Sequence, residues 1–419
     1  MSEIDEIIES TNLKTFDILD INPLFRIGDY VGLTPPEIAI AYNMPASTGA
    51  GVKVGIIAPL GGGFLQSDLD KTFDDLKYSG LIASGTAAPT INQVLLDGTS
   101  GTFTGAGADM ENTLDIYAIA TLVPAANITI YFSGSFVTAI NRAVSDGCHV
   151  LSISYTYSIG EPGSSTIAAV ETALSTASAA KVAICVSSGD SGSTFSGLST
   201  VKVAYPSSSP NVISVGGTKL ILNSNKTRQT ETDDNRDLDF SATWGGGGGI
   251  SGYFSLPSWQ SGLYYTPINS STIGSSTALT MRGLPDISGP MNGHLCYFNG
   301  SIVSVGGTSA SAPVMAGMLT RIQALTGNQR SSAEYNTLFY KHKTSFYDII
   351  VGSNNTLITS GYVGTTDWDP VTGLGPPVGN SVHQYLKNGL RPISGKIFPN
   401  TKFDRRPTSG QMWPRTKTL

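Results

Sequence analysis

The stretch Gly306-Gly307-Thr308-Ser309-Ala310-Ser311-Ala312-Pro313 joins a strand-like run to a helix-like run. The residues before it, 302–305, are mostly apolar and β-branched, which is typical of a strand. The residues from 313 to 319 are typical of a helix, and a proline is tolerated in a first helical turn. Because two glycines allow a sharp turn between these elements, we predict that Ser309 lies at or just before a helix N-terminus.

The predicted position of Ser309 has two interpretations. A hydroxyl at a helix N-terminus faces free backbone N–H groups and the positive end of the helix dipole, which suits a nucleophile whose reaction develops an oxyanion. A serine or threonine after a glycine turn is also a common helix N-cap without any chemistry. These eight residues leave both interpretations open, and the rest of the chain has to decide.

Composition sets broad limits on the protein class. The chain has 419 residues, of which 40% are hydrophobic, enough for the core of one large domain or two ordinary ones. Only 13% of the residues are charged, and 48 glycines and 22 prolines favour a compact, loop-rich globule. The formal net charge of −6 gives no reason to expect nucleic-acid binding. Three cysteines without metal-like spacing argue against a disulfide framework, and Cys185 is predicted to be a core residue.

The two ends of the chain differ in charge from its middle. Residues 1–30 hold seven acidic side chains against two basic ones, and we expect residues 1–32 to form an acidic N-terminal arm without the order of a signal peptide. Residues 391–419 hold seven basic side chains against one acidic one, and we expect a basic, proline-containing tail that is extended or disordered. A single large domain would then span residues 33–390. Its most apolar long stretch, 114–132, contains charged and helix-breaking residues, so we predict no membrane span.

Strand-like and helix-like runs alternate along the first half of the domain. The predicted strands are 52–58, 128–132, 150–155 and 182–186, and the predicted helices are 67–78, 109–122, 135–145 and 164–180. This alternation predicts an α/β fold with a mostly parallel, doubly wound sheet. Ligands of such sheets bind at the carboxyl ends of the strands. Residues 225–280, which include Gly245–Gly249, are expected to be mostly a flexible surface loop.

A serine nucleophile needs a group that accepts its proton, and histidine is the usual one. The chain has four histidines, at positions His149, His294, His342 and His383. None of them lies in a glycine-rich turn that leads into a helix, which is where a subtilisin-type histidine would lie. A histidine-based triad is therefore disfavoured.

Carboxylates offer other candidates. Asp109, Glu111 and Asp115 lie in the first part of the predicted helix 109–122. The helix dipole favours acidic residues in a first turn, which accounts for Asp109 and Glu111 without any chemistry. Asp115 lies deeper, among apolar residues and on the same helix face as Glu111. The two carboxylates would repel each other when ionised, so a shared proton would lower the cost.

Asp190 follows the predicted strand 182–186, within Ser187-Ser188-Gly189-Asp190-Ser191-Gly192. It could be a turn residue whose side chain bonds its own backbone. It could equally be a site residue at the carboxyl end of a strand.

Three motifs in this order resemble the sedolisin (serine-carboxyl peptidase) family: Glu111-x-x-x-Asp115, Ser188-Gly189-Asp190-Ser191-Gly192 and Gly307-Thr308-Ser309-x-Ser311-x-Pro313. Three further stretches also match the family, namely Leu60–Phe64, Leu256–Gln260 and Arg282–Asp286. The similarity covers residues 33 to 388. Each motif alone is moderately specific for the family, and the motifs together in this order are strong evidence for the resemblance.

The resemblance implies a subtilisin-like fold and an acid-active endopeptidase. Ser309 would be the nucleophile, Glu111 its general base, and Asp115 the acid that shares a proton with Glu111. A protonated Asp190 would donate a hydrogen bond to the oxyanion, beside the Ser309 N–H. A carboxylate is a weak base at neutral pH, and an ionised Asp190 would repel the oxyanion, so both roles point to an acidic working pH.

The resemblance also implies one calcium ion near the C-terminus. Its ligands would be the side chains of Asp348 and Asp369 and the carbonyls of Ile349, Thr365 and Asp367. Two carboxylates with carbonyls and water suit a hard cation that takes oxygen ligands. The family usually has glycine at the position of Asp367.

The chain departs from the family pattern in three other ways. Pro59 stands where many relatives have glutamate before the Leu-Gly-Gly-Gly turn, and Tyr155 stands where some have tryptophan, so an outer set of hydrogen bonds around the acids is missing or rebuilt. Relatives, which are mostly extracellular or lysosomal, carry a signal peptide and a long pro-domain, and neither feature is visible here.

We therefore predict an acid-active serine-carboxyl endopeptidase with one calcium ion, protein or peptide substrates, no nucleic-acid partner and a monomeric state. The alternative is a non-catalytic binding or structural protein that reuses the fold and docks through its basic tail. The intact set Glu111, Asp115, Asp190 and Ser309 argues against that alternative, because decay of catalysis usually removes at least one such residue.

Overall fold

The computed structural model describes residues 7–9, 25–27, 30–157, 159–194, 200–233, 244–355 and 360–388. The predicted basic tail at 391–419 lies outside the described residues. The described parts of the predicted acidic arm are the short strands β1 (Ile7–Glu9), β2 (Phe25–Ile27) and β3 (Tyr30–Gly32). Strand β1 pairs with β8 (Tyr155–Tyr157) and β2 pairs with β3, both antiparallel.

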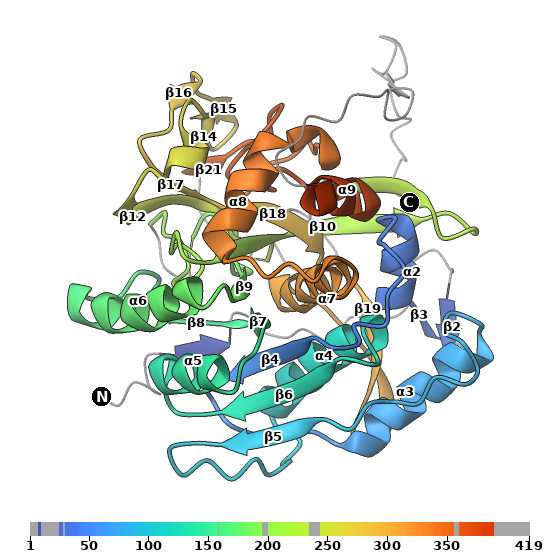
Figure 1. Cartoon of the computed structure of the whole chain (residues 1–419). Helices are drawn as coiled ribbons and strands as arrows, with labels where there is room; N and C mark the ends of the chain where they lie inside the picture. The colour runs from blue at the N-terminus through green and yellow to red at the C-terminus, as the bar shows by residue number, and fades with distance from the viewer. Residues whose placement is uncertain are drawn as a thin grey trace, which may run out of the picture.

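A largely parallel sheet forms the centre of the protein (Figure 1). Its strands are β4 (Lys53–Ala58), β5 (Asn92–Leu95), β6 (Asn127–Phe132), β7 (Val150–Ile153), β9 (Ala183–Ser187), β10 (Ile213–Leu222), β11 (Arg228–Asp233) and β18 (Ile287–Pro290). Their order across the sheet is β11-β10-β9-β7-β4-β6-β5, and β18 also pairs with β10. All of these pairs are parallel except β10 with β11. The prediction of a mostly parallel sheet is therefore confirmed.

The helices described are α2 (Pro35–Ala41), α3 (Gln66–Tyr78), α4 (Gly107–Leu122), α5 (Phe136–Ser145), α6 (Ser164–Ala179), α7 (Thr308–Thr326), α8 (Ser332–Lys341) and α9 (Gly379–Asn388), with short 3₁₀ turns at Ser258–Gln260 and Lys343–Ser345. Helices α3 to α6 correspond to the four predicted in the first half of the domain, and α7 contains the predicted helical run 313–319. Within the described ranges, none of the helices combines the length and the apolar character needed to cross a membrane.

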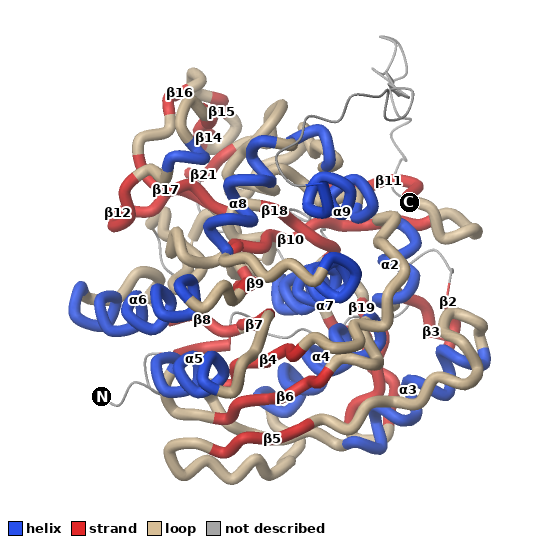
Figure 2. The backbone as a smooth tube through the Cα atoms, viewed as in Figure 1, coloured by secondary structure: helices blue, strands red, loops and turns tan. Residues whose placement is uncertain are grey.

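Smaller ribbons lie beside the central sheet (Figure 2). Their strands are β12 (Gly249–Ser255), β13 (Tyr264–Tyr265), β14 (Pro267–Asn269), β15 (Thr272–Ile273), β16 (Thr277–Ala278), β17 (Met281–Leu284), β19 (His294–Phe298), β20 (Ser301–Val305) and β21 (Ser360–Tyr362). Strand β20 is the strand-like run that leads into the Gly306–Pro313 stretch, and it pairs antiparallel with β19.

Helices cover both faces of the sheet, as the residues of β4 illustrate. Successive side chains of a strand point to opposite faces. Val54, Ile56 and Ala58 belong to the hydrophobic cluster that contains residues of α4 and α7, whereas Ile57 belongs to the cluster that contains residues of α5 and α6. A continuous apolar run is what a strand buried on both faces requires. The doubly wound prediction is confirmed, and the fold is a single large α/β domain.

The three cysteines are buried free thiols, so the chain has no disulfide. Cys185 has no exposed surface and belongs to the core, as predicted.

The expectation of a mostly flexible surface loop over residues 225–280 is wrong for the glycine run Gly245–Gly249, whereas most residues from 261 to 280 are exposed. Residues Gly245–Gly249 are buried. A Cβ atom on Gly247 would lie 2.2 Å from the Ser188 carbonyl oxygen, and one on Gly248 would lie 2.1 Å from the Pro370 carbonyl oxygen. These glycines are needed because other backbone segments approach too closely for a side chain.

We expect Gly247→Ala to lower the free energy of unfolding by roughly 1–3 kcal/mol, because the new methyl group must displace the backbone at Ser188. Chemical denaturation measures this loss. Gly85→Ala is the matched control, since a Cβ atom there would meet nothing within 4 Å. Equal stabilities of the two variants would contradict the close packing of Gly247.

Candidate active site

The four predicted catalytic side chains come from three segments. Glu111 and Asp115 lie on α4, Ser309 lies on α7, and Asp190 follows β9. All four residues are buried, with 0% to 5% of their surface exposed. Helices α4 and α7 pack against each other on one face of the sheet (Figure 1). Asp190 lies at the carboxyl end of a parallel strand, which is where the sequence predicts ligand chemistry.

Helix α7 begins earlier than its sequence predicts. Its first residue is Thr308, after Gly307, whose φ of 131° favours glycine. Ser309 is therefore the second helical residue, and Pro313 lies inside the helix rather than in its first turn. Because proline has no N–H, Pro313 cannot donate the usual helical hydrogen bond to the Ser309 carbonyl four residues earlier.

Ser154, directly after β7, contacts both the acidic pair and the serine. Its hydroxyl is placed to donate to Asp115 Oδ1 at 2.6 Å and to the Ser309 carbonyl oxygen at 3.3 Å. The Ser309 hydroxyl in turn donates to the Ser154 carbonyl oxygen at 3.4 Å. The structure thus brings Asp115 and Ser309 together at one residue. Sequence reasoning did not single out Ser154, although its place at the carboxyl end of a buried strand was a usable signal.

Asp190 is held against the start of α7. Its Oδ1 accepts hydrogen bonds from the Thr308 N–H at 2.7 Å and from the Thr308 hydroxyl at 2.8 Å. Its carbonyl accepts from the Gly245 N–H at 3.0 Å, which ties it to the buried glycine run. Its Oδ2 is buried and has no hydrogen-bond partner within the part of the chain that the structure describes. Asp190 is therefore adjacent to Ser309 and has one carboxyl oxygen available.

Burial changes the titration of two of these carboxyl groups. It raises the pKa of Asp115 to about 8 and that of Asp190 to about 7, while hydrogen bonds from Ser154 and from Thr308 lower them by less. The folded protein therefore holds both protons more tightly than the unfolded chain does. The stability that these groups contribute is complete below the ordinary pKa of 3.8 and is lost as the pH rises through 7 to 8.

Asp109 anchors the glycine turn that lies over α4. Its carboxylate accepts hydrogen bonds from the backbone N–H groups of Gly63 at 2.5 Å, Thr104 at 2.6 Å and Gly105 at 2.6 Å. Burial raises the pKa of Asp109, but these bonds together outweigh it and lower the pKa below its usual value. Asp109 is thus an ionised structural anchor, in agreement with the non-chemical interpretation of its position.

The hydrogen bonds around the acids are rebuilt where the chain departs from the family pattern. The Tyr155 hydroxyl donates to Asn112 Oδ1 at 3.4 Å, and the Asn112 amide donates to the Gly61 carbonyl at 2.9 Å. Asn112 is the neighbour of Glu111 on α4. The tyrosine and the glycine turn that follows Pro59 are therefore joined through an asparagine.

The histidines lie in other environments. His149 precedes β7 and accepts a hydrogen bond from the Lys53 N–H at the amino end of β4, which is the opposite end of these strands from Ser154. His294 Nε2 lies 3.0 Å from the Pro290 carbonyl oxygen. His149 and His294 therefore both contact backbone groups of other segments.

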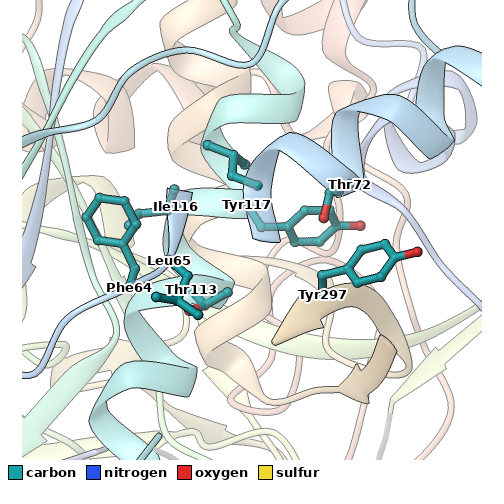
Figure 3. A pocket seen from close by; sticks show the side chains of 8 residues that line it. Phe64, Leu65, Thr72, Thr113, Ile116, Tyr117 and Tyr297 are labelled. Carbon is teal, nitrogen blue, oxygen red and sulfur yellow. The ribbon is translucent and has the colours of Figure 1, made fainter. Parts of the chain in front are cut away.

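A small pocket lies between α3, α4 and β19 (Figure 3). Its lining residues are Phe64, Leu65, Leu69, Thr72, Thr113, Ile116, Tyr117 and Tyr297. Thr113 and Tyr117 each follow a candidate acid of α4 by two residues and therefore point to the other side of that helix. The pocket has room for about one water molecule, too little for a peptide side chain.

The predicted calcium ligands lie on two segments that meet. The Asp348 carboxylate accepts a hydrogen bond from the Asp367 N–H at 3.0 Å, and the Asp369 carboxylate accepts one from the Thr365 N–H at 3.0 Å. Burial, together with a smaller effect of the Asp348 charge, raises the pKa of Asp369 to about 7 although backbone hydrogen bonds lower it. The two carboxylates are therefore close enough to repel each other.

The donor set at this place fits a hard cation. Among the described residues, no three His, Cys, Asp or Glu side chains are grouped so that they could hold a metal, so oxygen from carbonyls or water would have to complete the two carboxylates. Asp367 has a φ of 69°, in the left-handed region that favours glycine. The backbone at Asp367 therefore has a conformation that glycine adopts more readily than aspartate.

The fold and this arrangement define a subtilisin-like chain with a buried serine among carboxyl groups. A family model described as the subtilase family matches residues 101–344, more than half of the chain. Kumamolisin from Bacillus sp. (strain MN-32) is 35% identical over 369 residues, 84% of this chain. Sedolisin from Pseudomonas sp. (strain 101) is 31% identical over 412 residues, 89% of this chain. The alignments span 63% and 66% of these relatives' own lengths.

A solved structure of Pseudomonas sedolisin, complexed with pseudo-iodotyrostatin, superposes with a TM-score of 0.68 and 27% identity. The match covers 85% of this chain and 98% of that one. The chain therefore belongs to the subtilase family and, within it, to the sedolisin family.

Proposed function

We propose that the chain is an acid-active serine-carboxyl endopeptidase whose catalytic residues are Ser309, Glu111, Asp115 and Asp190, and that residues 33–390 form its peptidase domain. The observation that carries this proposal is the place of Asp190. Its carboxyl group bonds the residue before Ser309, and burial raises its pKa to about 7, so it holds its proton in acid. A neutral carboxyl group there can donate a hydrogen bond to a developing oxyanion.

The proposed reaction proceeds in two halves. Ser309 Oγ attacks the scissile carbonyl carbon as its proton passes to the Glu111 carboxylate, and the electron pair of the C=O bond moves to the oxygen beside Asp190. Glu111 returns the proton to the leaving amine as the C–N bond breaks. Water then attacks the acyl ester in the same way, which releases the acid and restores Ser309. Asp115 retains a proton near Glu111, which lowers the repulsion between the two carboxyl groups.

The test of this function is proteolysis of a denatured protein at about pH 4 and about pH 7.5, by the wild type and by Ser309→Ala. We expect cleavage by the wild type only, and faster at the lower pH, because Asp190 must be protonated. Equal cleavage by Ser309→Ala would overturn the proposal. Peptide binding without cleavage by either protein would support a non-catalytic role.

We also propose that the chain binds one calcium ion through the side chains of Asp348 and Asp369 and the carbonyls of Ile349, Thr365 and Asp367. The convergence of two mutually repelling carboxylates supports this proposal. A bound cation would neutralise both charges and fix the two segments on which they lie.

Removal of calcium with excess chelator is expected to lower the melting temperature. A ligand at a hundred times its dissociation constant stabilises the folded state by about 2.7 kcal/mol. Asp348→Ala should abolish this response, whereas Asp74→Ala, which changes an exposed aspartate of α3, should keep it. Metal analysis of the purified protein gives an independent readout. Absence of calcium together with unchanged melting would show that the site is wrongly assigned.

A further inference from the structure

Ser154 lies between the acidic pair and the serine. Building on the peptidase function above, we propose that Ser154 is a positioning residue that transmits the protonation of Asp115 to the turn of α7 that carries Ser309. Ser154 belongs to none of the motifs that carry the family resemblance.

The Ser154 hydroxyl has two acceptors within reach and only one proton. Its oxygen lies 2.6 Å from Asp115 Oδ1 and 3.3 Å from the Ser309 carbonyl oxygen. A serine hydroxyl can donate one hydrogen bond and can accept others through its lone pairs. Which acceptor receives the proton therefore depends on whether Asp115 can itself donate.

The two protonation states of Asp115 give different hydrogen-bond directions. An ionised Asp115 takes the Ser154 proton, because a charged acceptor forms the stronger bond. A protonated Asp115 can donate to Ser154 Oγ instead, and the Ser154 proton is then directed to the Ser309 carbonyl. Only the protonated state gives a continuous chain of donors from Asp115 to Ser309.

The hydrogen bond from Ser154 to the Ser309 carbonyl matters because of Pro313. In a regular helix that carbonyl would receive the N–H of residue 313, and proline has none. The Ser154 carbonyl oxygen also accepts a hydrogen bond from the Ser309 hydroxyl, at 3.4 Å. One residue thus contacts both the backbone and the side chain of the nucleophile, so its orientation affects where Ser309 Oγ lies.

Glu111 shares a proton with Asp115 in the proposed mechanism, so the two acids titrate together, and the other ionisable groups nearby do not provide a competing switch. The ionisable side chains on the elements packed around α4 include Glu111 on α4, Asp190 after β9, Arg321 on α7, Glu37 on α2, Asp68 on α3, and His294 and Cys296 on β19. Burial raises the pKa of Asp115 and the Ser154 bond lowers it, with no contribution from a basic side chain. Helix α7 has no ionisable residue before Arg321, which bonds the Leu122 carbonyl at the far end of α4.

The decisive experiment compares Ser154→Ala with the wild type across pH. We expect kcat to fall roughly two- to tenfold, as for the loss of a hydrogen bond between neutral groups, with KM within about twofold. Because the Ser154 bond lowers the pKa of Asp115, its removal should also move the alkaline limb of the kcat profile to higher pH when both proteins carry Asp190→Asn, since Asp190 otherwise sets that limb at about pH 7. A purely structural role would not move that limb.

Two variants separate hydrogen bonding from packing. Ser152→Ala is the matched control, because Ser152 lies on β7 two residues before Ser154, is fully buried, and its hydroxyl has no hydrogen-bond partner within the described residues. It should keep the wild-type kcat and pH profile. Ser154→Cys fills the space of the hydroxyl with a weaker donor. It should behave like Ser154→Ala if the hydrogen bond matters, and like the wild type if only the volume matters.

Carboxyl NMR titration of Asp115 gives a readout that does not require catalysis. The pKa of Asp115 should be about one unit higher in Ser154→Ala than in the wild type, and unchanged in Ser152→Ala. An Asp115 pKa that is the same in Ser154→Ala and in the wild type would overturn the role of Ser154. So would a Ser154→Ala variant that keeps the kcat and the alkaline limb of its parent protein. An inactive wild type that still shows the NMR shift would instead refute the peptidase function.

Discussion

Ser309→Ala and Glu111→Gln are each expected to lower kcat by about a thousandfold or more, with little change in melting temperature. When several residues act together in catalysis, removal of any one of them costs nearly the whole rate enhancement that they provide together. Ser309→Ala removes the nucleophilic oxygen, and Glu111→Gln keeps the shape of the side chain but cannot accept the serine proton. Both changes are small in volume at buried positions, so the fold should persist. Steady-state cleavage of a peptide substrate and thermal melting measure the two quantities.

Glu171→Gln is the matched control for Glu111→Gln. Glu171 lies on α6, where burial raises its pKa and it accepts hydrogen bonds from Ser209 and Asn211. Helix α6 packs in the hydrophobic cluster on the face of the sheet opposite to α4 and α7. This control should lose some stability but retain kcat. Near-normal cleavage by Glu111→Gln would show that another group accepts the proton.

The central sheet and its helices were predictable because local sequence is sufficient to specify them. A strand buried on both faces must be apolar throughout, and Val54 to Ala58 meet that condition without a partner being known. The position of Asp190 was predictable for a similar reason, since it follows a buried strand and the carboxyl ends of parallel strands meet at one edge.

The glycine run could not be interpreted from sequence alone. Glycine serves both flexible loops and places where backbones approach closely, and the sequence does not distinguish these uses. The segment that excludes a side chain at Gly247 is Ser188, which lies 59 residues earlier in the chain. Long-range contacts of this kind decide burial, and no local pattern encodes them.

Ser154 and Pro313 illustrate a similar limit within the site. Proline at position 313 is visible in the sequence, but its effect depends on where α7 begins, and helix boundaries are the least certain part of a sequence-based prediction. The structure shows that Thr308 is the first helical residue, so Ser309 already belongs to the helix. Pro313 is then the residue whose N–H would normally bond the Ser309 carbonyl. Ser154, which donates to that carbonyl, follows β7 and lies 155 residues earlier in the chain.

Asp190→Asn and Asp190→Ala are expected to differ strongly in activity. The loss of one oxyanion donor costs about a hundred- to a thousandfold in kcat, so Asp190→Ala should lose that much. Asp190→Asn keeps a donor of similar shape and should retain part of the acid activity. Because an asparagine cannot ionise, the alkaline limb should move upward from about pH 7, where Asp190 loses its proton. Asp115, with a pKa of about 8, still titrates, so the shift should be partial.

The same two variants test the titration of Asp190 through stability, independently of catalysis. The pKa of Asp190 is raised in the folded state, so the wild type loses stability as the pH rises from the ordinary value of 3.8 through about 7. Asp190→Asn and Asp190→Ala remove that dependence, and their free energies of unfolding should fall less between pH 5 and pH 8 than that of the wild type. Chemical denaturation at both pH values measures the difference. Equal activity in all three proteins, with parallel stability profiles, would reduce Asp190 to a structural turn residue and remove the proposed oxyanion donor.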